Sequence, residues 1–210
     1  MLELTNIKKE FSGQLILSIP SLKFNKGLYW MKGGNGSGKT TLLKMIAGLL
    51  PFDGTIQLNQ SIDSKKNPVE YRRFVNYAEA EPLFPSFLSG NDLVHLFEKA
   101  KQAQTADVKD LIQAFAIDLF LDNPIGTYSS GMVKKLSLVL GFIGNPKLIL
   151  LDEPLVTLED HSIPILIKLI NQYHTIRDVT FLLTSHQLLE HKDFLTMQAI
   201  LVKDKTVCYQ

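Results

Sequence analysis

A glycine-rich segment followed by lysine and threonine constrains this chain more than any other feature of its sequence. Gly33, Gly38, Lys39 and Thr40 match the pattern G-x-x-x-x-G-K-[ST]. Glycines let successive backbone N–H groups turn inward around phosphate oxygens without a clash from a Cβ atom. The helix expected to follow presents the positive end of its dipole to the same anion. The segment is therefore interpreted as a phosphate-binding loop, and the alternative is a glycine turn beside an unrelated lysine.

The loop assigns distinct roles to its last residues. Lys39 is expected to reach the β- and γ-phosphates of a nucleoside triphosphate and to act in catalysis, and Thr40 to place its hydroxyl on Mg²⁺. The candidate nucleotide-binding residues of the loop are Gly33, Gly34, Asn35, Gly36, Ser37, Gly38, Lys39, Thr40 and Thr41.

A second candidate site is an apolar run that ends in two acids. Leu148–Leu151 is typical of a buried strand, and Asp152 and Glu153 follow it directly. Ligands of an open α/β sheet collect at the carboxyl ends of its strands, so Asp152 suits Mg²⁺ together with Thr40. Glu153 suits a general base that polarises the attacking water. The alternative is a solvated strand end without a function.

Two weaker candidates lie further along the chain. Ser129 and Ser130 stand at the expected N-cap of a helix, where their hydroxyls and Gly131 could bind an anion, although an ordinary helix cap is the alternative. His186 follows an expected strand and can contact a γ-phosphate there. A lone histidine is more often structural, so His186 is a weak candidate by itself.

The order of the expected elements favours an α/β fold. A helix is predicted after the phosphate loop from the spacing of Leu42, Leu43, Ile46 and Leu49, and residues 82–145 are predicted to form a mainly helical insert. Strands are predicted at 2–7, 15–19, 28–31, 55–58, 74–77, 148–151, 179–183 and 199–202. Strands that alternate with helices imply a core with a largely parallel sheet.

Composition excludes several classes of protein. The 210 residues include 22 Lys+Arg and 21 Asp+Glu, and this balance argues against nucleic acid as a partner. The single cysteine, Cys208, excludes a disulfide framework. The longest apolar stretch, Leu136–Gly144, is shorter than the roughly 20 residues that span a membrane, and no signal peptide is expected. We therefore expect a cytoplasmic protein or one on the cytoplasmic face of a membrane.

Taken together, these motifs make nearly the whole chain resemble the ATP-binding subunits of ABC transporters. Residues 33–41 are similar to the Walker A loop of that family, and residues 148–154 to its Walker B strand followed by Glu-Pro. Residues 128–132, Tyr-Ser-Ser-Gly-Met, stand where the family has the signature Leu-Ser-Gly-Gly-Gln. The order and spacing of these segments with Ser185-His186 are very specific for the family.

The resemblance implies a single ABC-type ATP-binding domain over residues 1–210. Residues 1–81 and 146–210 would form a P-loop NTPase core with a mainly parallel sheet and an N-terminal antiparallel β-subdomain. Residues 82–145 would form an inserted helical subdomain that carries the signature. Phe11 matches the aromatic residue that stacks on adenine, and a packed aromatic is the alternative.

The resemblance also implies partners. Two such domains, as a homodimer or a heterodimer, would pair head to tail, and Ser129, Ser130 and Gly131 would close on the ATP–Mg²⁺ in the partner's Walker A loop. A separate transmembrane permease would convert ATP hydrolysis into transport. The subunit itself would be peripheral on the cytoplasmic face of the membrane.

Three positions depart from the family pattern. Ala80 stands where the family has a glutamine that touches Mg²⁺, and we hypothesise that Glu79 or Glu81 substitutes for it, since Mg²⁺ accepts carboxylate oxygens. The signature has Ser130 for the first glycine and methionine for the glutamine, a form that resembles exporter-type subunits. Glu159 replaces the terminal aspartate of the loop after Walker B.

Two other functions compete with that of a transporter motor. One is a soluble ABC-type ATPase that acts on DNA, ribosomes or iron–sulfur assembly; the sequence lacks the heptad-rich insertion of the DNA-repair relatives and the second nucleotide domain of the translation relatives. Relatives of the assembly type are not excluded by the sequence. The other is a P-loop kinase, which the signature and His186 disfavour.

Overall fold

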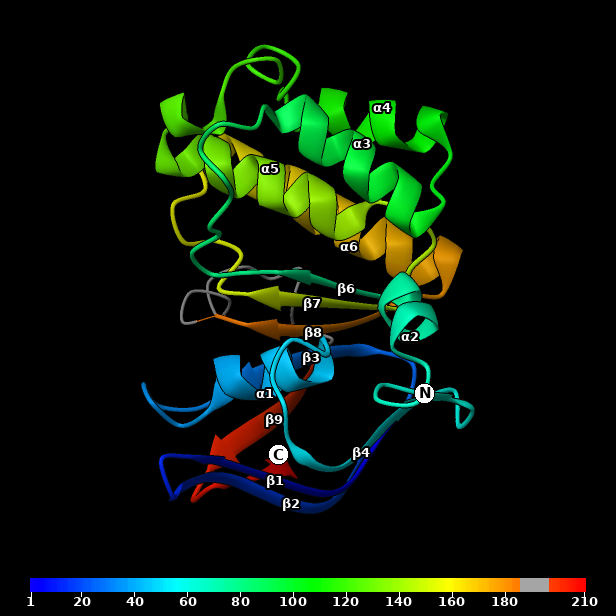
Figure 1. Cartoon of the computed structure of the whole chain (residues 1–210), viewed down its shortest axis with the longest axis vertical. Helices are drawn as coiled ribbons and strands as arrows, with labels where there is room; N and C mark the ends of the chain where they lie inside the picture. The colour runs from blue at the N-terminus through cyan, green and yellow to red at the C-terminus, as the bar shows by residue number, and fades with distance from the viewer. Residues whose placement is uncertain (186–196) are drawn as a thin grey trace.

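Two β-sheets organise the residues that the computed structural model describes, 1–185 and 197–210 (Figure 1). The smaller sheet has the strand order β2-β1-β4-β5 and is antiparallel. The larger sheet has the order β10-β9-β3-β8-β7-β6, and its strands are parallel except for the edge strand β10. The strands are β1 Leu2–Phe11, β2 Gln14–Phe24, β3 Leu28–Lys32, β4 Asp53–Leu58, β5 Ile62–Asp63, β6 Val75–Ala78, β7 Leu148–Asp152, β8 Thr180–Thr184, β9 Gln198–Lys203 and β10 Thr206–Tyr209. The predicted α/β class, with a mainly parallel sheet and an antiparallel N-terminal sheet, is confirmed.

Helices cover both faces of the larger sheet. On one face, α5 and α6 pack against the strands, and α3 and α4 lie against α5; on the other face, α1 lies between the two sheets (Figure 1). The helices are α1 Lys39–Ile46, α2 Pro68–Phe74, α3 Gly90–Lys101, α4 Thr105–Ala114, α5 Ser130–Phe142 and α6 Ile163–Arg177, with short 3-10 turns η1 Ile125–Thr127 and η2 Asp160–Ser162.

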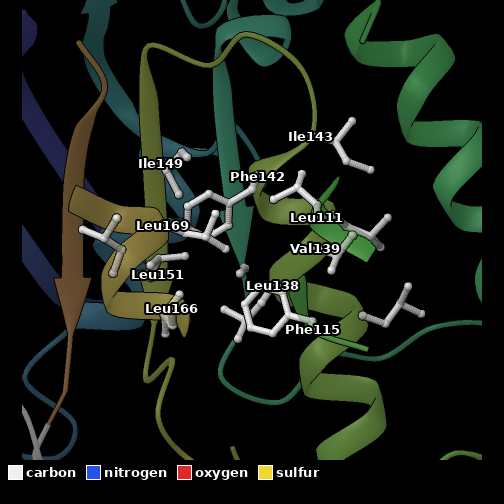
Figure 2. Close-up of a cluster of buried hydrophobic side chains, with 14 of the residues drawn as sticks. Leu111, Phe115, Leu138, Val139, Phe142, Ile143, Ile149, Leu151, Leu166 and Leu169 are labelled. Atoms are coloured by element: carbon white, nitrogen blue, oxygen red, sulfur yellow. The ribbon is translucent and has the colours of Figure 1, made fainter. Parts of the chain in front are cut away.

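Strand β7 is apolar from Leu148 to Leu151 because both of its faces are covered. Leu148 and Leu150 belong to the core that contains α1 and the smaller sheet. Ile149 and Leu151 point to the opposite core, where Figure 2 shows them beside side chains of α5 and α6, among them Phe142. The packing of β7 in both cores therefore fixes the position of Asp152, the last residue of the strand.

Parallel pairing brings several carboxyl ends to one edge of the larger sheet. Asp152 of β7 is in register with Thr184 of β8, and Met31 of β3 is in register with the same Thr184. Ala78, the last residue of β6, pairs with Leu151. The phosphate loop after β3 and the two acids at the end of β7 consequently leave the sheet at the same edge, as the sequence analysis predicted.

Two local predictions are wrong. Helix α1 ends at Ile46, so Leu49 is not on its buried face and is 53% exposed. Gly48, with a φ of +72°, takes the left-handed conformation that commonly ends a helix. Phe74 belongs to α2 and not to a strand, because Pro68 opens a short helix there.

Helices α3, α4 and α5 all lie within the predicted helical insert, residues 82–145. The division into a core, 1–81 and 146–210, and this insert stays a prediction. No helix in the described part of the chain has both the length and the apolar character of a membrane span.

Candidate ATP site

The phosphate loop is shaped by close backbone packing. A Cβ atom at Gly33 would lie 2.6 Å from the carbonyl oxygen of Val202, so only glycine fits between the loop and β9. Gly38 is the N-cap of α1 with a φ of +102°, in the region that glycine adopts without strain. Helix α1 then begins at Lys39, which places its free N–H groups at the loop. The positive end of the helix dipole is therefore at the loop, and phosphate binding there stays a prediction.

The lysine of the loop lies over the loop itself. Lys39 Nζ donates to the carbonyl oxygens of Gly33 at 2.8 Å and Gly34 at 3.1 Å. The positive charge is thereby held beside the turn whose N–H groups would meet a phosphate.

A pocket of about 640 Å³ opens beside the loop. Its walls bring together the loop from Asn35 to Thr41 with Phe11 at the end of β1 and Glu153 after β7. Phe11 is 45% exposed, and Lys9 Nζ lies 4.5 Å from the centroid of its ring. An exposed aromatic ring at one end of a phosphate-binding pocket offers a stacking face for a base.

The two acids at the end of β7 are held by residues of the neighbouring strands. Asp152 is 1% exposed; its Oδ1 accepts from the Thr184 hydroxyl at 2.6 Å, and its Oδ2 accepts from the Tyr77 hydroxyl at 3.2 Å. Burial, followed by the carboxylates of Asp152 and Glu79, raises the pKa of Tyr77, which keeps its hydroxyl protonated as a donor. These donors compensate part of the cost of burying a carboxylate.

Glu153 adopts an unusual backbone conformation. Its φ is +43°, in the left-handed region that residues other than glycine seldom adopt, and its N–H donates to the Thr184 hydroxyl at 2.9 Å. The side chain lines the pocket beside the phosphate loop. Backbone strain of this kind clusters at functional sites, where the surrounding structure maintains it.

Thr40 and Asp152 fit the ligand chemistry of Mg²⁺. A hydroxyl and a carboxylate are hard oxygen donors, and both carboxylate oxygens of Asp152 are already oriented by hydrogen bonds. The described residues contain no group of three or more His, Cys, Asp or Glu side chains that could hold a metal by themselves.

The signature segment begins α5 but does not reach the pocket. Ser129 caps the helix, its Oγ accepting from the Met132 N–H at 3.2 Å, as expected for an N-cap. Ser129 and Ser130 are exposed, and neither lines the pocket beside the phosphate loop in the part of the chain that the structure describes. A Cβ atom at Gly131 would lie 3.3 Å from the carbonyl oxygen of Thr157, so the signature packs on the loop after β7.

Two other residues singled out in the sequence form ion pairs and do not line the pocket beside the phosphate loop. The Glu79 carboxylate lies 3.4 Å from Lys44 Nζ of α1. Glu159 pairs with Lys135, and that hydrogen bond lowers the pKa of its carboxyl. His186 lies outside the described residues.

Comparison with known proteins identifies the family. A family model described as ABC transporter matches residues 17–156. The chain belongs to the ABC transporter family. One relative in this family, the cytochrome c biogenesis ATP-binding export protein CcmA of Legionella pneumophila, is 33% identical over 189 residues, which cover 89% of this chain and 93% of the relative. The ABC transporter ATP-binding protein YtrB of Bacillus subtilis is 29% identical over 190 residues, 90% of this chain and 64% of YtrB.

Solved structures of ABC proteins share the fold. An ATP-binding subunit of an ABC transporter superposes with a TM-score of 0.87 at 23% identity, over 100% of this chain and 89% of that one. The ATP-binding cassette MJ0796, solved as a dimer in a post-hydrolysis state with ADP and Pi, gives a TM-score of 0.82 at 16% identity, over 100% and 98% of the two chains. The protein is thus an ABC ATP-binding subunit of a transporter, and as a member of this family it is an ATPase.

Proposed function

We propose that this ABC subunit is the motor of a membrane transporter and that two copies, or this chain and a similar one, close on two ATP–Mg²⁺ complexes. The observation that carries the proposal is that the signature serines do not line the pocket beside the phosphate loop in the described residues. Phe11, the phosphate loop and Glu153 line it, whereas the exposed Ser129 and Ser130 do not. A second subunit would supply the missing helix N-terminus to the phosphates.

Within this pocket each residue has a defined task. Phe11 stacks on the base, and Lys39 and the N–H groups of the loop bind the phosphates. Thr40 and Asp152 would hold Mg²⁺, which would supply positive charge to neutralise the phosphates. Glu153 accepts a proton from the attacking water, with its backbone fixed by the hydrogen bond to Thr184. His186 is assigned to the γ-phosphate by resemblance alone.

The variant Glu153→Gln tests the dimer. It should bind ATP but hydrolyse it at least about 100-fold more slowly. It should also dimerise when ATP is present, because without hydrolysis the closed dimer does not open. Size-exclusion chromatography with and without ATP measures this. A monomer under both conditions contradicts self-pairing, and rapid hydrolysis by the variant contradicts the role of Glu153.

We further infer that a transmembrane permease contacts a groove beside β6, the edge strand of the larger sheet. The groove has a volume of about 530 Å³, and its lining includes Val69, Leu83, Leu96 and Phe97. Leu83 is 93% exposed and Val69 is 75% exposed. Exposed apolar residues gathered in a groove are typical of an interaction site, and the groove also includes Glu79 of the segment after β6.

A charge placed in the groove tests this contact. Leu96→Asp should abolish co-sedimentation of this subunit with membranes that contain its permease, because an aspartate would be buried in the contact without a partner. Ile176→Asp is the matched control, since Ile176 is also exposed but lies on α6 outside the groove. Equal losses in the two variants would contradict the groove as the contact site.

The direction of transport that we propose is export, from the cytoplasmic face of the membrane. The relative CcmA is named as an export protein, and the Ser-Ser-Gly-Met form of the signature supports the same direction. The cargo is chosen by the permease. Transport into inside-out vesicles that contain both subunits, dependent on ATP, would support export, and ATP-dependent loss of cargo from such vesicles would contradict it.

A further inference from the structure

Lys134 is a fully buried lysine one turn into the signature helix, and the function described so far does not use it. Its exposed fraction is 0%, which is unusual for a lysine. Its Nζ donates to the carbonyl oxygens of Glu79 at 3.0 Å, Ala80 at 3.1 Å and Asp152 at 3.4 Å. An ammonium group has three N–H donors, so these three acceptors satisfy it.

The three acceptors come from two separate segments at the catalytic edge of the sheet. Glu79 and Ala80 follow β6, and Asp152 ends β7. Lys134 itself belongs to α5, whose first residues are the signature. One side chain therefore ties the signature helix to the ends of two neighbouring strands.

Keeping a charge at this position is costly. Burial lowers the pKa of Lys134 to about 8, and the carboxylates of Asp152 and Glu153 oppose that change. An apolar side chain would fill the same space without the desolvation cost. Ala80 stands where the family has a glutamine, and its side chain has no polar group. The Lys134 ammonium instead binds the backbone carbonyl of Ala80 and so fixes the loop at this position.

We propose that Lys134 is a positioning residue for ATP hydrolysis, whose ammonium holds the ends of β6 and β7 together and fixes the backbone from which Glu153 extends. When the signature closes on a partner's ATP, the same ammonium links the movement of α5 to Glu153. The inference rests on the proposed role of Glu153 as the base. Because Lys134 does not line the nucleotide pocket, it acts on the chemical step and not on ATP binding.

The test compares Lys134→Met with Asn76→Leu. Methionine keeps the length of the side chain without the ammonium. Asn76 is a matched control: it is buried, and its Nδ2 donates to the carbonyl oxygens of Gly141 and Ile143, both at 2.9 Å. It therefore also links β6 to the region of α5, but at the end of that helix remote from the signature.

Steady-state ATPase kinetics and thermal unfolding are measured on the whole subunit. We expect Lys134→Met to lower kcat about tenfold or more, with the KM for ATP within about threefold of the wild type. Asn76→Leu should lower Tm but keep kcat within about twofold. A wild-type kcat in Lys134→Met, or an equal loss of kcat in Asn76→Leu at a similar Tm, would overturn the proposal.

A second variant and measurement cover the case in which methionine prevents folding. Lys134→Gln keeps N–H donors without a charge and should also lower kcat at an unchanged KM; a wild-type kcat would overturn the proposal. Amide hydrogen exchange at residues 79–81 should rise in the folded variant. If Glu153→Gln blocks hydrolysis while the Lys134 variants retain it, the role of Glu153 stands and only the role of Lys134 fails.

Discussion

At the scale of single residues, the Thr184 hydroxyl organises both acids of the site. It donates to Asp152 and accepts from the N–H of Glu153, so one oxygen orients the proposed magnesium ligand and the proposed base. Thr184 is in register with Asp152 across the β7–β8 pair. The site thus depends on a residue that touches no nucleotide-binding group of the loop in the described structure.

Replacing Thr184 with valine keeps the shape of the side chain and removes the hydroxyl. A buried carboxylate oxygen and a backbone N–H then lose a partner, which we expect to destabilise the fold by about 1–3 kcal/mol and to lower kcat about tenfold or more. Urea unfolding and ATPase assays measure the two effects. Thr180→Val, at the start of the same strand, is the control and should retain kcat; equal activity in the two variants would contradict the role of Thr184.

The segment after β6 contains two carboxylates, Glu79 and Glu81, that could supply an oxygen ligand for magnesium. Ala80 lacks the side-chain oxygen of the family glutamine, and the structure pairs Glu79 with Lys44. If Glu79 or Glu81 supplies the missing oxygen, alanine at both positions should lower the ATPase rate severalfold and raise the Mg²⁺ concentration needed for half-maximal activity. An unchanged rate and an unchanged Mg²⁺ dependence would show that neither carboxylate substitutes.

At the scale of secondary-structure elements, a half-buried lysine joins α3 to the region of α2 and β6. Lys101 Nζ donates to the carbonyl oxygens of Arg72 and Val75. Burial, and to a smaller extent the nearby Arg72 charge, lowers its pKa to about 8 from the ordinary 10.5. Between these two pKa values the unfolded chain binds more protons than the folded chain, so this group makes stability rise with pH.

The variant Lys101→Met isolates the contribution of this lysine to the pH dependence of the free energy of unfolding. The free energy of unfolding of the wild type, relative to the variant, should increase by about 1 kcal/mol from pH 7 to pH 9. Urea unfolding at the two pH values measures the difference. A constant or decreasing difference would show that Lys101 has an ordinary pKa in the folded protein.

Local patterns predicted many elements but not their long-range contacts. The phosphate loop, β7 and the capped start of α5 each have a signal within a few residues, and all were predicted. Helix α2 is not predicted from the sequence, because its seven residues are too few to show the apolar spacing of a helix. Lys134, Thr184 and Tyr77 were missed because their partners lie at least 18 residues away along the chain.

At the scale of the whole molecule, the signature serines and the pocket beside the phosphate loop are separate in the described residues. The phosphate loop and Glu153 line one pocket, while the signature serines are exposed at the start of α5. The central claim is that two subunits complete each site. Each subunit would then provide its phosphate loop to one site and its signature to the other.

Mixing two inactive variants tests this claim most directly. Lys39→Ala removes the loop lysine, and Gly131→Asp places a carboxylate in the signature, so each variant alone should hydrolyse ATP very slowly. In a mixed dimer, one site combines the intact loop of one subunit with the intact signature of the other. Mixing should therefore restore about a quarter of the wild-type ATPase rate, since half of the dimers are mixed and each has one complete site. A rate no higher than that of the separate variants would contradict the account.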